Sequence, residues 1–177
     1  MNYTNDIRDY LALEIEILKK LDVEQINAAL NLLDETRQKK GRIYICGNGG
    51  SAATASHFQN DFNKGVSEYI DVPFRFHCLN DNVATLMAIA NDIGYEEVFR
   101  FQLRNNLEEN DVLVAISGSG NSHNVIRAVE YAKEHGYRLA LATSSRELHA
   151  QLLLKKYGLF DYFDGAVYGN MVSAGKP

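Results

Sequence analysis

The chain is poor in several residue types that mark particular classes of protein. Its 177 residues include two cysteines, two prolines and no tryptophan. Cys46 and Cys78 are too few for a disulfide framework and do not stand in a metal-ligand spacing. We expect two buried free thiols, with a disulfide or a metal pair as the alternative. No run approaches the ~20 apolar residues of a membrane span.

Basic residues are scarce as well. Lysine and arginine together number 18 against 23 acidic residues, a formal net charge of −5. This balance argues against broad electrostatic binding to nucleic acid or to an anionic membrane. The charged N-terminal segment is not expected to be a signal peptide. The sequence therefore predicts a soluble cytoplasmic protein that would hold a phosphate locally, with backbone N–H groups and hydroxyls.

The first forty residues predict two helices. Apolar residues recur at helical spacing in the first, and the second begins with Asp22 as N-cap and Gln25 three positions later. Two such helices cannot bury both of their faces alone. We expect them to pack on another subunit as well as on their own domain.

From residue 42 onward, short apolar segments alternate with helical ones. Strands are predicted over 42–46, 74–79, 111–116 and 138–142 and around 166–168, and helices over 52–62, 83–90, 95–107, 123–135 and 147–157. This alternation predicts an α/β fold: a three-layer sandwich with a parallel, five-stranded, doubly wound sheet and two N-terminal helices.

Two of the predicted strands run into loops rich in glycine and serine, at residues 47–51 and 117–122. Glycine lets the backbone approach a ligand closely, and the helix that follows offers unpaired N–H groups to an anion. Either loop alone is as well explained as a tight connector. Neither fits the P-loop pattern, and the first matches the dinucleotide fingerprint poorly. Two such loops can converge on one phosphate at the carboxyl edge of the sheet.

Three separated motifs carry a family resemblance: GNGGSAATASHFQNDF, AIANDIGYEEVF and ISGSGNSHNVIRAVEYAKEHG. Over about residues 1–143 the chain resembles the sugar isomerase (SIS) family, in its phosphoheptose isomerase-like branch. The resemblance implies a homotetramer with sites near subunit interfaces. It also implies a phosphosugar site in which the phosphate contacts Ser51, Ser117, Ser119 and Ser122 and the sugar contacts Asn48 and Asp92. A turn or cap role is the alternative for Asp92.

Isomerisation of an aldose to a ketose needs a base to move a proton between adjacent carbons. His57 and Asp61 lie four residues apart on one predicted helix face and are the catalytic candidates. Their spacing also suits a divalent metal such as zinc. A structural hydrogen bond for His57 and a solvated surface acid for Asp61 are the alternatives. The family usually has glutamate where this chain has Asp61, and the shorter side chain can misplace a base.

The C-terminal stretch departs from the family. The Gln and His that complete the active site in phosphoheptose isomerases are not found, although His149 is a candidate substitute or else a surface helix residue. Residues 144–177 instead resemble a fragment of a haloacid-dehalogenase-type phosphatase without its nucleophile motif. We expect a chimera, a fusion or a piece of a longer chain, in which 144–177 complete the domain formed by 1–143 and add no phosphatase activity.

Two functions follow from these observations. The first is a phosphosugar-binding isomerase related to enzymes acting on sedoheptulose 7-phosphate. The second is a non-catalytic phosphosugar-binding regulator or scaffold protein, which the missing Gln and His favour.

Overall fold

The computed structural model describes residues 1–142, 151–152, 155–156, 158 and 165–167. The prediction made for His149 lies outside these residues, as does most of the helix predicted over 147–157.

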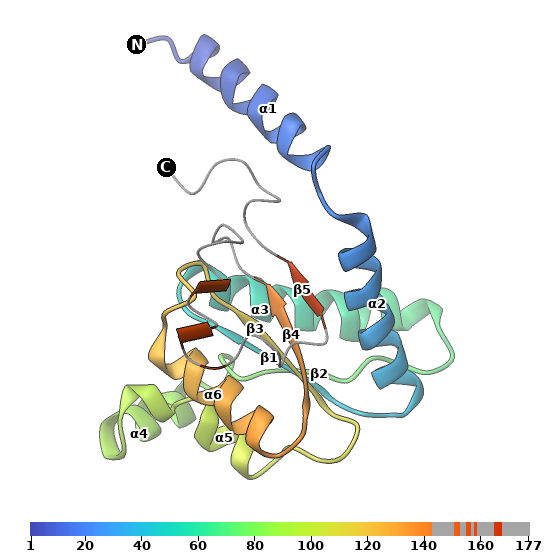
Figure 1. Ribbon diagram of the computed structural model, residues 1–177, viewed down its shortest axis with the longest axis vertical. Helices are drawn as coiled ribbons and strands as arrows, with labels where there is room; N and C mark the ends of the chain where they lie inside the picture. The colour runs from blue at the N-terminus through green and yellow to red at the C-terminus, as the bar shows by residue number, and fades with distance from the viewer. Residues whose placement is uncertain (143–150, 153–154, 157, 159–164, 168–177) are drawn as a thin grey trace.

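A parallel β-sheet forms the centre of the fold (Figure 1). Its strands are β1 (Ile43–Gly47), β2 (Phe76–Cys78), β3 (Val112–Ile116), β4 (Arg138–Ala142) and β5 (Gly165–Val167). They lie in the order β2-β1-β3-β4-β5, and every neighbouring pair is parallel. The predicted α/β class with a parallel sheet is confirmed.

Helices cover both faces of this sheet. The covering helices are α2 (Val23–Gln38), α3 (Gly50–Asn60), α4 (Val83–Asp92), α5 (Arg100–Arg104) and α6 (His123–Glu134), and α1 (Thr4–Leu18) precedes them in the chain. A π-helical turn, η1 (Asp61–Val66), continues α3, and η2 (Ser67–Tyr69) and η3 (Tyr95–Glu97) are 3₁₀ turns. The single helix predicted over 95–107 is wrong. The helix is interrupted at Val98 and Phe99, which lie between η3 and α5 and are both buried in the core.

The two faces of β1 show how the layers form. Tyr44 and Cys46 belong to the core shared with α4, α5 and α6, whereas Ile43 and Ile45 belong to the core shared with α2 and α3. A parallel strand covered on both sides needs an unbroken apolar run, and the run from residue 43 to 46 supplies it.

Both cysteines are free and buried, as predicted. Burial raises the pKa of the Cys46 thiol and raises that of Cys78 to about 11. Both thiols are therefore protonated at neutral pH, the state of an inert structural cysteine.

The helix α1 stands away from the rest of the chain (Figure 1). It has no buried residue, although it carries a stripe of exposed apolar side chains, among them Ile7, Tyr10, Leu11 and Leu18.

Asp22 caps α2 as predicted, accepting hydrogen bonds from the backbone N–H groups of Glu24 and Gln25, each at 3.1 Å. Within the described part of the chain, no helix combines the length and apolar character needed to cross a bilayer.

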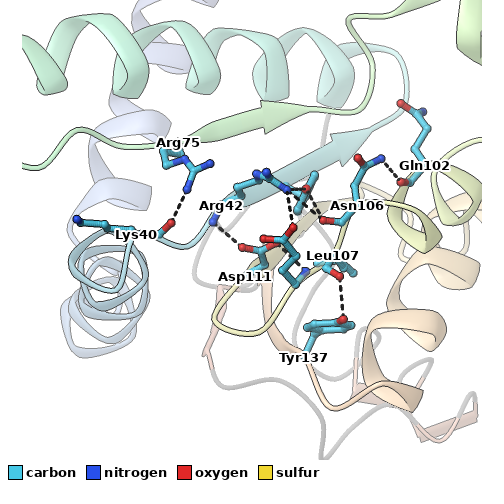
Figure 2. Close-up of polar contacts among 10 residues, drawn as sticks. Lys40, Arg42, Arg75, Gln102, Asn106, Leu107, Asp111 and Tyr137 are labelled. Carbon is cyan, nitrogen blue, oxygen red and sulfur yellow. Dashed lines mark hydrogen bonds and ion pairs between the residues drawn. The ribbon is translucent and has the colours of Figure 1, made fainter.

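The amino-terminal edge of the sheet is closed by a polar network (Figure 2). The backbone N–H of Arg42 donates to the buried carboxylate of Asp111 at 2.7 Å, and the Arg42 guanidinium lies 3.7 Å from Glu108. The hydroxyls of Tyr44 and Tyr137 donate to loop carbonyls at 2.9 and 3.0 Å. The polar groups drawn at this edge in Figure 2 bond one another, whereas the two serine-rich loops lie at the opposite, carboxyl edge.

Side chains from α3 and the turns after it cover the open side of the edge strand β2. The N–H of Cys78 donates to Gln59 Oε1 at 2.6 Å, and the N–H of Phe74, just before β2, donates to Ser67 Oγ at 2.8 Å. Between them, Asn63 pairs with both backbone groups of Phe76, each at 2.8 Å. These side chains bond backbone groups that an exposed edge strand would otherwise leave open to aggregation.

Replacing Asn63 with alanine should lower the free energy of unfolding by ~1–3 kcal/mol, because two backbone groups of Phe76 lose their partner. For a chain of this length each kcal/mol lowers the melting temperature by ~2–4 °C. Thermal unfolding followed by circular dichroism measures the shift. Asn91→Ala is the matched control, since among the described residues the Asn91 side chain bonds only its neighbour Asp92. Equal melting temperatures for the two variants would contradict this role for Asn63.

Candidate functional site

The two glycine- and serine-rich loops leave the sheet side by side. From β1 the chain passes to β2 on one side and then to β3 on the other, so β1 and β3 flank a topological switch point. Gly47 and Ile116, the last residues of these strands, are register partners. Ligands of open α/β sheets bind in the crevice at such a point.

The first loop needs glycine at its start. A Cβ on Gly47 would lie 2.7 Å from the Cβ of Ser51 and 2.9 Å from the carbonyl oxygen of Ile116. Asn80 holds Gly47 from the other side, accepting from its N–H at 3.2 Å and donating to its carbonyl at 2.8 Å. This close approach sets Ser51 in the first turn of α3, at the positive end of the helix dipole.

The second loop is shaped by its own serines. Ser117 Oγ accepts from the N–H of Gly120 at 3.0 Å, and Ser119 Oγ accepts from the N–H of Asn121 at 3.2 Å. Each of these hydroxyls still has its own O–H to donate. Ser122 is the N-cap residue of α6 and makes no side-chain capping bond. Serine O–H groups and a helix N-terminus together suit an anion.

Beside these loops lies an open pocket of about 590 Å³, lined by Asn48, Tyr95, Glu96, Ser122, His123, Asn124 and Arg127. The amides of Asn48 and Asn124 bond each other reciprocally, at 2.8 and 2.9 Å. The hydroxyl of Tyr95 donates to Asn48 Oδ1 at 3.0 Å. The pocket thus joins the first loop, the turn η3 and the start of α6.

His57 and Asp61 form a pair, with Nε2 and Oδ2 3.2 Å apart. Both side chains are well exposed, at 73% and 53%. At 1.5 Å per helical residue, His57 lies ~9 Å and Asp61 ~15 Å along the helix from Ser51. The pair is therefore separate from the serine loops of its own chain.

The same pair is too small for a complete metal site by itself. Zinc sites use three or four protein ligands. Over the described residues, no third His, Cys, Asp or Glu side chain joins His57 and Asp61 in a metal-binding group.

Asp92 is the second predicted sugar contact. It ends α4, is exposed, and accepts a hydrogen bond from Asn91 at 2.7 Å. The described lining of the pocket includes Asn48 and Ser122 but not Asp92.

Sequence reasoning missed Tyr95, Asn124 and Arg127. Asn124 offered a signal, because it occupies a core-facing position of α6 next to Val125 and Ala128. A buried amide requires hydrogen-bond partners, and here those partners belong to the site.

Comparison with known proteins gives consistent matches. The family model described as "SIS domain" matches residues 2–144. A phosphoheptose isomerase from Helicobacter pylori strain 26695 is 41% identical over 136 residues, which are 72% of this chain and 67% of the relative. A phosphoheptose isomerase from Bordetella avium is 38% identical over 155 residues, which are 88% of this chain and 72% of the relative.

Among solved structures, phosphoheptose isomerase GmhA from Neisseria gonorrhoeae superimposes with a TM-score of 0.79 at 30% identity. The match covers 94% of this chain and 86% of that one. The expected resemblance of residues 144–177 to a dehalogenase-type phosphatase, and with it a chimeric origin, is not supported by these comparisons.

Proposed function

The chain belongs to the family of SIS domains, and from this premise we propose that it binds a sugar phosphate and isomerises it between aldose and ketose forms. The observation that carries the proposal is the pair of serine loops at the β1/β3 switch point. Sedoheptulose 7-phosphate is the substrate we propose, because the similar proteins are phosphoheptose isomerases.

The phosphate would occupy the serine loops. Ser51, Ser117, Ser119 and Ser122 supply hydroxyl donors, and the N-terminal ends of α3 and α6 supply the positive ends of their helix dipoles. Since the protein is acidic overall, these local donors must compensate for the unfavourable net charge. Asn48 in the adjoining pocket would contact the sugar, and Asp92 is proposed as a second contact.

Asp61 and His57 are the proposed catalytic residues. In sedoheptulose 7-phosphate the carbonyl end and the phosphate are at opposite ends of the sugar. A base some distance from the phosphate loops is therefore what this substrate requires, and α3 separates the two. Asp61 would take the proton from one of the carbons C1 and C2 and return it to the other. His57 would shuttle a proton between the oxygens on these two carbons.

Removing single hydroxyls tests the phosphate site. Ser119→Ala and Ser122→Ala should each weaken binding of sedoheptulose 7-phosphate by ~10- to 150-fold, the equivalent of one hydrogen bond to a charged group at ~1.5–3 kcal/mol. Isothermal titration calorimetry measures the affinities. The control is Thr54→Val, which removes an exposed hydroxyl from α3 that bonds only the carbonyl of Gly50, at 3.1 Å. Absence of binding by the wild type, or equal binding by all four proteins, would refute the site.

The domain and the assembly are proposed on separate observations. Residues 144–177 are proposed to complete the domain formed by 1–143, which the pairing of β5 with β4 supports. One unfolding transition in the melting experiment is then expected, and two would argue against it.

The exposed apolar stripe of α1 supports a homo-oligomer, proposed to be a tetramer.

The rival function is a phosphosugar-binding regulator without turnover. The carboxylate of Asp61, one methylene shorter than the glutamate usual at this position, can misplace the base and so leaves room for this rival. Such a protein would pass the binding test and show no isomerisation.

A further inference from the structure

The amide of Asn48 is held in one orientation by its neighbours. Its Oδ1 accepts from Asn124 Nδ2 at 2.9 Å and from the hydroxyl of Tyr95 at 3.0 Å, and its Nδ2 donates to Asn124 Oδ1 at 2.8 Å. These partners come from α6 and from η3, two segments distant from Asn48 in sequence.

The orientation can be traced to a backbone group that cannot reverse its role. The N–H of Val125 donates to Asn124 Oδ1 at 2.9 Å. A backbone N–H is only a donor, so this bond fixes which end of the Asn124 amide is oxygen. Asn124 is only 2% exposed and packed in place, and its fixed amide in turn fixes that of Asn48.

A hydrogen-bond inventory then shows what Asn48 can offer. Its oxygen already accepts two hydrogen bonds, and one of its two N–H groups is used. The second N–H has no partner among the described residues. Asn48 can therefore act toward a ligand in the pocket as a donor.

We propose that Asn124 and Tyr95 are positioning residues, which hold Asn48 so that its free N–H donates to a carbonyl or hydroxyl oxygen of the sugar. This inference rests on the proposed function, because it needs a sugar phosphate bound with its phosphate at the serine loops. It assigns to Asn48 recognition of the sugar, separate from binding of the phosphate.

Tyr95→Phe tests the inference with little risk to the fold, since the Tyr95 side chain is largely exposed. It should weaken binding of sedoheptulose 7-phosphate by about 2- to 12-fold, the equivalent of one neutral hydrogen bond. Affinity for inorganic phosphate, which has no sugar, should stay within about twofold of the wild type. Tyr69→Phe, which removes a hydroxyl from another exposed tyrosine, is the matched control and should change neither affinity.

A second measurement needs no ligand. The side-chain amide signal of Asn48 in a nitrogen–proton NMR spectrum can be identified by its loss in Asn48→Asp. Tyr95→Phe should shift this signal and Asn124→Ser should shift it further, whereas Tyr69→Phe should leave it in place. An unshifted signal in Tyr95→Phe would overturn the proposed hydrogen bond.

The outcomes separate the inference from the proposed function. If the wild type binds the sugar phosphate and Tyr95→Phe binds it equally well, the positioning role is wrong and the function stands. Parallel losses for sugar phosphate and inorganic phosphate would indicate general damage to the site and would also overturn the role. If the wild type binds no sugar phosphate, the proposed function fails and the inference fails with it.

Discussion

Replacing Asp61 with asparagine should lower kcat for isomerisation of sedoheptulose 7-phosphate by about 10²- to 10⁴-fold, the usual contribution of a positioned general base. The amide keeps the size of the side chain and can still bond His57, which lies 3.2 Å away, but it cannot take a proton from carbon. Binding should change little, because the proposed phosphate contacts lie at the far end of α3.

The control for this experiment is Asp71→Asn, which removes an exposed carboxylate of the same kind. Turnover by coupled assay and binding by calorimetry should be measured on the same preparations. Full activity of Asp61→Asn would place the base elsewhere. Binding without turnover in the wild type would favour the regulator instead.

Asp61→Glu separates the two explanations for an inactive wild type. If the short side chain alone misplaces the carboxylate, adding one methylene should raise kcat, since small displacements of a catalytic group change rates strongly. If Asp61→Glu is also inactive, the missing function lies in residues other than Asp61.

Much of the fold could be predicted from local pattern. The unbroken apolar run of β1 and the spacing of apolar residues in α6 identify a covered parallel strand and an amphipathic helix. Asp22 could be assigned as a cap because its role depends on neighbours two and three residues away. The break between η3 and α5 could not be predicted, because it depends on where Val98 and Phe99 enter a core built from distant segments.

The candidate site, like the fold, could be predicted from the sequence only in part. Its glycines and serines could be found because a loop between strand and helix is a local feature. Tyr95 could not, because its importance lies in a hydrogen bond to Asn48 across 47 residues of sequence. Asn124 offered only its core-facing position as a signal, since its partner Asn48 lies 76 residues away in sequence. Conversely, the i, i+4 spacing correctly predicted that His57 and Asp61 would meet, but it gave no measure of their distance from the phosphate loops.

Leu11→Asp should convert the proposed oligomer into a monomer of 19.9 kDa. Leu11 is 51% exposed within the stripe on α1, and α1 buries none of its side chains against the rest of the described chain. A surface of this kind is expected to be covered by a partner, and a second copy of the chain presents a matching stripe. Each buried leucine stabilises an interface by ~1.5–3 kcal/mol, and symmetry repeats the loss in every copy. The dissociation constant of the oligomer should therefore rise by at least ~10²-fold.

Ala12→Asp is the matched control, because it adds the same charge at the adjacent position on the polar side of α1. Light scattering after size-exclusion chromatography gives the mass of each variant. The wild type and Ala12→Asp should share a mass that is a multiple of the monomer, with four copies as the proposed number. A monomeric wild type would refute the oligomer, and an undissociated Leu11→Asp would show that the interface lies elsewhere.

Since α1 contributes nothing to the described core, Leu11→Asp should keep its secondary structure. Loss of turnover in that folded monomer would indicate that the active site requires a neighbouring subunit.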